Sequence, residues 1–307
     1  MQDTSKAKSN AAIRPMLCAG GVYPKQANVL KRELNRYLSA IPNPQSPINF
    51  PRGILSPHID YARGGAAYAA AWKAMQPAAQ QADLAIILGT DHRGAGQLFT
   101  LTHQSYATPY GVLPTAHAIN QSIAQAIGPQ RAYAGEMFHT AEHSIELPLV
   151  WLHHMREGAP IDVLPVIVGG FWDEMQRKRS PATNAQVIAF ISALKNAMQG
   201  RNVIVIASGD LSHVGPVFDG PPLSESDKAD LQAYDQTIMQ HITAGDAEGW
   251  FAALAETQNA TNVCGLAPVY LTLRLIEPSK GQALSYAVCP ADEQTTSVVS
   301  VCGAVLV

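Results

Sequence analysis

Two kinds of hydrophobic segment alternate along the chain. Near-continuous apolar runs bounded by glycine, proline or aspartate are typical of buried strands, and they lie at residues 53–56, 83–90, 97–102, 161–169 and 202–209. Around these runs, apolar residues recur at helical spacing. This spacing predicts helices at 25–41 and near 65–76, 115–127, 143–156, 185–198, 224–243, 246–257 and 265–276.

The alternation predicts the fold class. Strands that are apolar on both faces, separated by helices, indicate a single-domain α/β sandwich with a central, mostly parallel (mixed) sheet flanked by helices. The last two segments, "LSYAVCP" and "TSVVSVCGAVLV", are joined by a polar turn, so we expect an antiparallel hairpin at one side of the sheet. Residues 1–16 are predicted to be a polar, mobile leader, and residues 17–307 one domain.

Composition restricts the class of partner. The chain has 307 residues, 47% of them hydrophobic and 15% charged, with a net charge of -3. Such a balance predicts a compact protein that binds neither nucleic acid nor a membrane. The polar first residues lack the apolar core of a signal peptide, and no apolar run approaches the ~20 residues of a membrane span. We therefore expect a cytoplasmic protein.

Three predicted strands end in the same residue types. In a parallel sheet the carboxyl ends of the strands share one edge, where such folds bind ligands. Turn formation explains single aspartates at these ends, but it does not explain the repeated histidines, which favour a common site. The residues concerned are His58 and Asp60, Asp91 and His92, and Asp210 and His213.

Cys264 is a further candidate. It directly precedes an apolar helix, whose N-terminus favours a thiolate, although a small buried cysteine is the alternative. The other three cysteines resemble packing residues, and no pair has the spacing of a zinc finger or a disulfide scaffold.

The segment "MFHTAEHSIELPLVWLHH" carries more titratable groups. Thr140 is predicted to cap a helix whose first turn contains Glu142 and His143. An alternative interpretation of Glu142 is that it only stabilises the helix dipole and has no role in a site. His153 and His154, near the end of this helix, are predicted to lie at the surface.

Five motifs occur in one order: "SPHIDY", "LGTDH", "EHSIELPLVWL", "SGDLSH" and "NVCGLAP". Together they resemble the Memo family, including the bacterial AmmeMemoRadiSam system protein B, from about residue 20 to the last strand. The family is similar in fold to class III extradiol dioxygenases, which hold non-haem iron at the edge of a central sheet.

The resemblance implies roles for individual residues. His58, His92 and Cys264 would bind a metal, with Fe(II) expected and copper or zinc as alternatives. Asp210 and His213 would stand beside it as catalytic residues, with His213 in the place of the dioxygenases' acid/base histidine, and Glu142 and His143 would belong to the same catalytic pocket. The dioxygenases use a carboxylate where this pattern has a cysteine, a softer ligand that changes how the metal handles O2. Ring cleavage therefore does not follow from the fold.

Several functions stay open at this point. The leading hypothesis is an iron-dependent, dioxygenase-like oxidoreductase acting on an unknown small molecule. A metal-dependent hydrolase is an alternative, as is a non-catalytic protein that handles metal or binds a peptide. The resemblance also implies radical-SAM and AMMECR-type proteins as partners. Two interpretations carry equal weight for three further residues, which either line a pocket or only pack and cover the surface: Tyr61, Arg63 and Trp172.

Overall fold

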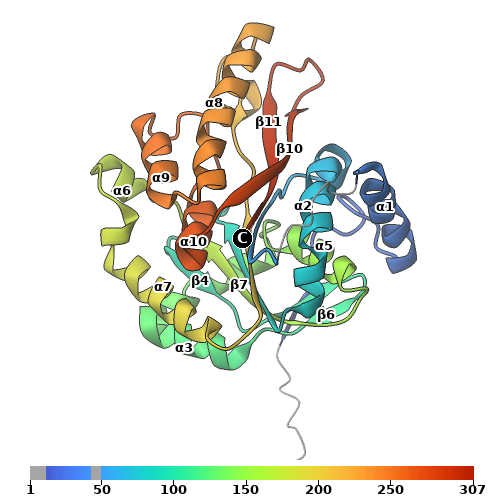
Figure 1. Ribbon diagram of the computed structural model, residues 1–307, viewed down its shortest axis with the longest axis vertical. Coiled ribbons are helices and arrows are strands. Elements are labelled where there is room, and N and C mark those ends of the chain that lie inside the picture. Colours follow the sequence, from blue (N-terminus) through green and yellow to red (C-terminus); the bar gives the residue numbers. More distant parts are fainter. Residues whose placement is uncertain (1–11, 43–49) are drawn as a thin grey trace, which may run out of the picture.

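The computed structural model describes residues 12–42 and 50–307, and its centre is an eight-stranded mixed sheet (Figure 1). Strands β2, β8, β3 and β7 are parallel neighbours, and the others run antiparallel to the strands they pair with. The expected α/β sandwich and its closing hairpin are therefore confirmed. The order across the sheet is β10 (Gly281–Pro290), β11 (Val298–Leu306), β2 (Gly53–Ser56), β8 (Val203–Ser208), β3 (Leu84–Thr90), β7 (Asp162–Val168) and β4 (Phe99–Leu101), with β9 (His213–Val214) paired to β11.

Both faces of the sheet are buried, which explains the continuous apolar runs. Along β3, Leu84, Ile86 and Leu88 join one hydrophobic cluster, whereas Ala85 and Ile87 join the other. Successive strand residues point to opposite faces, so each face of such a strand needs its own apolar set.

Helices cover the two faces (Figure 1). One cluster includes side chains of α1 (Ala27–Ala40), α2 (Tyr61–Gln81) and α5 (Glu146–Met155). The other includes side chains of α3 (His117–Ile127), α7 (Ala185–Met198), α8 (Glu225–Ala244), α9 (Ala247–Glu256) and α10 (Leu266–Ile276). The shorter helices are α4 (Pro129–Tyr133), η1 (Glu136–Thr140), α6 (Trp172–Gln176), η2 (Pro181–Thr183) and η3 (Pro216–Phe218). Within the described ranges, no helix combines the length and apolar character that a membrane crossing requires.

A second, three-stranded sheet was not expected. It consists of β1 (Ile13–Arg14), β5 (Ser105–Thr108) and β6 (Gly111–Leu113). Ile13 and Arg14 fall within the predicted leader, yet they pair with β5, and Arg14 is fully buried. The folded part thus begins before residue 17. The first eleven residues of the predicted leader lie outside the described residues.

The helix expected from residue 143 begins later, at Glu146. Thr140 does not cap it, because Thr140 ends η1 and its hydroxyl donates to the carbonyl of Met137. The intervening segment is held in a turn, since the Glu142 carboxylate accepts the backbone N–H groups of Ser144 and His92. This turn aims Glu142 at the end of β3.

Candidate metal centre

Three strand ends and one helix start meet at the carboxyl edge of the sheet. His58, His92 and Asp210 each lie two residues beyond the end of a parallel strand, β2, β3 and β8 respectively. Cys264 comes from the turn just before α10. One ligand atom from each of His58, His92 and Cys264 lies within 4.8 Å of the others. The structure thus brings together the three residues predicted as ligands; their binding of a metal stays a prediction.

His58 is held with one ring nitrogen facing Cys264. The Ser208 hydroxyl donates to the carbonyl of Ser144, so it accepts from Nδ1–H of His58, 3.2 Å away. This leaves the Nε2 lone pair directed at Cys264 Sγ, at 3.1 Å. Burial, and then the neighbouring His92, lower the pKa of His58 well below its usual value, which keeps the ring neutral. A neutral imidazole is the form that binds metal ions.

Glu142 orients His92 in the same way. Its carboxylate accepts from His92 Nδ1 at 3.0 Å and from the His92 backbone N–H at 3.0 Å. A carboxylate behind a histidine fixes the tautomer that leaves Nε2 free, as in many metal sites. Burial would raise the pKa of Glu142, but hydrogen bonds from His92 and Ser144 outweigh it and lower the pKa to about 2.

The surroundings of Cys264 favour the thiol over the thiolate, although the sequence placed this residue before a helix N-terminus that favours a thiolate. Burial, and then the negative charge of Asp210, raise the pKa of its thiol well above the usual value. The larger of two opposing contributions is the backbone N–H of Asp210, which donates to Sγ at 3.1 Å. A cation at this point would shift the balance toward the thiolate.

The donor set fits one transition-metal ion. A nitrogen and a sulfur atom bound to one ion at roughly 2.05 and 2.3 Å are about 3.1 Å apart when the angle at the ion is 90°, and about 3.6 Å apart when that angle is tetrahedral. The measured separation of His58 Nε2 and Cys264 Sγ is 3.1 Å. Two imidazoles and a sulfur suit iron, copper or zinc, and they do not suit calcium or magnesium, which prefer oxygen ligands.

Asp210 and His213 lie beside this triad, as predicted. Ligand atoms of both residues and of Cys264 lie within 4.8 Å of one another. His213 Nδ1 faces the carbonyls of Leu211 and Asn262, at 3.1 and 3.0 Å, so it carries the proton and leaves Nε2 free. Burial lowers the pKa of His213 to about 4 and raises that of Asp210 to about 6.

His143 completes a cluster of three imidazole rings. Its ring centroid lies 4.8 Å from that of His92 and 5.2 Å from that of His58, and its Nδ1 is 3.3 Å from the Glu142 carboxylate. Burial, and then His92, lower its pKa to about 4. His143 is therefore a neutral neighbour of the triad.

The other two strand-end aspartates form turns. Asp60 caps α2 and pairs with Arg63, and Asp91 accepts the backbone N–H groups of Arg93 and Ala95. The structural interpretation of a single aspartate after a strand is therefore right for these two residues, and Asp210 is the exception.

Comparison with known proteins shows the family of this chain. The family model described as "Memo-like protein" matches residues 14–305. The chain belongs to the Memo family. It is 27% identical to a MEMO1 family protein of Thermus thermophilus over 274 residues, which cover 89% of this chain and 76% of that protein. Identity is 24% with a MEMO1 family protein of Nitrosopumilus maritimus (89% and 92% covered) and 29% with one of Methanothermobacter thermautotrophicus (77% of each).

A cavity of about 500 Å³ opens beside the triad of this Memo-family chain. His92, His213 and Cys264 line it, together with Trp172, whose role the sequence left open. Tyr61 is not among its lining residues, and its buried hydroxyl donates to the carbonyl of Leu147.

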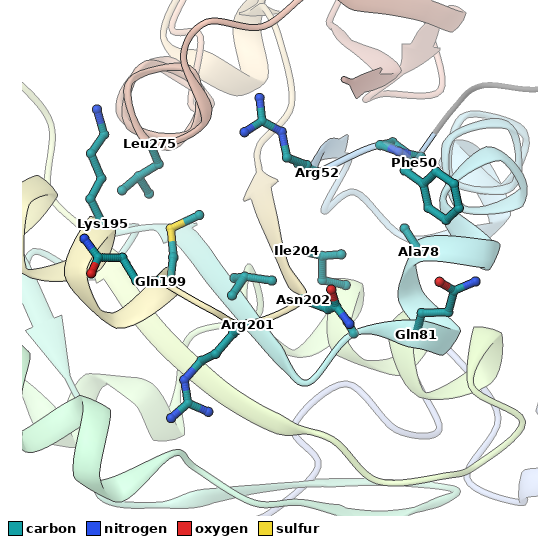
Figure 2. A pocket seen from close by; sticks show the side chains of 14 residues that line it. Phe50, Arg52, Ala78, Gln81, Lys195, Gln199, Arg201, Asn202, Ile204 and Leu275 are labelled. Carbon is teal, nitrogen blue, oxygen red and sulfur yellow. The ribbon is translucent and has the colours of Figure 1, made fainter.

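A second hollow, of about 360 Å³, lies at the opposite end of the strands, beside the first residues of β8. Figure 2 shows that the charged end of Arg201 points away from those of Arg52 and Lys195. Arg52 donates to main-chain carbonyls, and Lys195 pairs with Glu277. Because its polar groups do not converge, this hollow is the weaker candidate for a binding site.

Sequence reasoning missed the residues that support the triad. Ser208 ends an apolar strand, where a serine is too common to be a signal, and Arg14 lay in the predicted leader. His153 and His154 were predicted at the surface, but both are buried, with ring nitrogens bonded to Thr108 and Tyr110. The apolar residues around the whole of α5 were the available signal that this helix is buried on all sides.

Proposed function

We propose that this chain binds one Fe(II) ion through His58, His92 and Cys264 and catalyses the oxidation of a small organic molecule. The observation that carries the proposal is the convergence of three soft or borderline donors, two of them imidazoles with an orienting partner behind the ring. Such support is typical of metal ligands and is not required of packing histidines.

Fe(II) held by three protein ligands supplies open positions and one-electron chemistry toward O2. The chain's own residues supply the rest. His213 presents a free Nε2 to the cavity, so it is the candidate to move a proton to or from a bound molecule. Asp210 donates its backbone N–H to Cys264 Sγ, and its carboxylate accepts the backbone N–H of His58, so it aligns two ligands.

A second candidate function is metal handling without turnover. One observation favours it: the side chains of His92 and His143 are 30% and 35% exposed, whereas His58 is 2% exposed. A triad open to solvent on one side permits exchange of the ion with an acceptor. For this function iron, copper and zinc all suit the donor set.

Metal analysis under anaerobic conditions tests the proposal. Iron, copper and zinc are counted by mass spectrometry in the wild type and in His58→Ala, with Cys289→Ser as a control at a buried cysteine outside the triad. Near-stoichiometric iron in the wild type and the control, and its loss in His58→Ala with the fold intact, would support the assignment. Oxygen uptake by the iron-loaded protein then separates oxidation from metal handling. Iron-free protein that stays iron-free after reconstitution would contradict the proposal.

A further inference from the structure

The cavity beside the triad has one polar end and a mainly apolar wall. His92, His213 and Cys264 form the polar end. The wall includes the buried side chains of Phe171, Met175 and Leu266. Trp172 and Val217, each 56% exposed, mark its opening to solvent. Its volume of about 500 Å³ is in the range of small-molecule sites.

Polar groups on the wall are already used within the protein. The Asn259 side chain bonds both the N–H and the carbonyl of Val263. The Asn262 amide donates to the carbonyl of His213, and the Thr90 hydroxyl donates to that of Cys264. A ligand in this cavity therefore finds few partners for polar groups of its own away from the triad.

The charges that line the cavity are negative. Asp91 and Asp219 are among its lining residues, and no lysine or arginine is among those that the structure describes. Asp219 is exposed, so its carboxylate lies on the solvent side of the cavity. A carboxylate or phosphate at the outer end of a ligand would meet these charges, and the described lining residues offer no lysine or arginine to pair with it.

We infer that the cavity takes a small molecule with an apolar body, one polar group that reaches the triad, and an outer end that is neutral or cationic. Any reaction of this molecule at the triad rests on the proposed function. The ligand class rests on the cavity alone. The negative charges of the lining disfavour anionic molecules of the same size, and the mainly apolar wall disfavours strongly polar molecules such as sugars.

Three phenols matched in size test the charge preference: tyramine, 4-(2-hydroxyethyl)phenol and 4-hydroxyphenylacetate. Binding is followed by tryptophan fluorescence of the full-length protein, as purified and after chelator treatment. Trp72, Trp151 and Trp250 are fully buried, so the exposed Trp172 is the expected reporter. We expect the cationic and neutral probes to bind about tenfold more tightly than the carboxylate, because the charges of Asp91 and Asp219 repel an anion. Trp172→Phe should remove the signal, and equilibrium dialysis gives the affinity independently.

A charge substitution makes the test specific. Asp219→Asn keeps a residue that tolerates the left-handed backbone at this position, where φ is 61°, and removes one charge. We expect it to improve carboxylate binding about threefold relative to the neutral probe. Asp230→Asn, at an exposed position on α8, is the matched control and should leave the ratio unchanged.

Equal or tighter binding of 4-hydroxyphenylacetate in the chelator-treated protein, or no binding of any probe, would overturn the inference. Metal analysis of the same samples keeps the two proposals apart. If the protein holds no metal and the probes still bind in the expected order, the ligand class stands and the iron proposal fails. If iron is present and the order is absent, only the ligand class fails.

Discussion

Arg14 and Glu146 form a buried ion pair, although 132 residues separate them in the sequence. Arg14 also donates to the carbonyls of His139 and Glu142, and the Tyr23 hydroxyl donates to the Glu146 carboxylate. Residues near the start of the described chain therefore fix the position of the segment that contains Glu142, whose carboxylate bonds to His92. This pair links the small sheet to the candidate metal centre.

Loss of Arg14 alone should be strongly destabilising. Arg14→Met leaves the Glu146 carboxylate buried without a cation, which we expect to lower the free energy of unfolding by about 3 to 5 kcal/mol. Adding Glu146→Gln removes that charge, so the double variant should lose about 1 to 3 kcal/mol less than the sum of the single variants. Urea unfolding measures all four proteins. Additive effects would contradict a coupled pair.

Glu142 should act on metal affinity through His92. Glu142→Gln removes the carboxylate that accepts from His92 Nδ1, so we expect the affinity for a divalent metal to fall about 10- to 100-fold. Competition with a chelating dye measures this affinity. Glu256→Gln, at an exposed position at the end of α9, is the control. Equal affinities in the two variants would show that Glu142 has no supporting role.

Both stability and metal binding should require a residue without a side chain at Gly209. A Cβ at this position would collide with Cα of Gly265, the residue after Cys264. We expect Gly209→Ala to lower stability by about 2 kcal/mol, because the overlap forces the backbone apart, and to weaken metal binding by at least about tenfold. At Gly21 the nearest atom to an added Cβ is 3.9 Å away, so Gly21→Ala should change neither quantity. Thermal melts and the same dye assay compare the two variants.

Stability should fall in mild acid, in part because of His139. Burial, and the nearby Arg14 charge, lower its pKa from 6.5 to about 4 against the opposing bond to the Thr100 carbonyl. The unfolded chain binds a proton near pH 6.5 and the folded chain does not until about pH 4, so stability is lost as the pH falls through this window. At pH 5 the loss from this residue is about 2 kcal/mol relative to pH 7.

His139→Gln provides the check. Urea unfolding at pH 7 and pH 5 should show a smaller acid loss in this variant than in the wild type. His153 and His154, whose pKa values are also lowered by burial, contribute equally to both proteins and so cancel in the comparison. An identical acid loss in the two proteins would rule out His139 as a source.

Hydrophobic periodicity was enough to predict most of the main sheet and its helices, because both are built from long apolar segments that pack on each other. It did not predict β1, β5 and β6, since strands of two to four residues carry no readable alternation. Their pairing depends on tertiary contacts, such as the contact of Arg14 with Glu146. Local sequence patterns do not predict contacts of this kind.

The candidate site was predicted to a similar extent. The prediction of parallel strands was enough to place His58, His92 and Asp210 at one edge of the sheet, where the carboxyl ends of the strands lie. The strand-end pattern did not distinguish Asp210 from Asp60 and Asp91, because turns and sites use aspartate at the same place, and only the family resemblance singled out Asp210. Nor did it reveal Ser208 behind His58, since hydroxyl groups reach their partners only in the folded chain.

Cobalt substitution tests the central claim most directly. Co(II) added to chelator-treated protein reports its ligands by absorption, and a bound thiolate gives a charge-transfer band in the near ultraviolet. The account predicts one Co(II) per chain with this band in the wild type and in Cys289→Ser. It predicts loss of the band in Cys264→Ser and loss of Co(II) binding in His58→Ala, with both variants folded. A band that persists in Cys264→Ser, or Co(II) binding unaffected by His58→Ala, would contradict it.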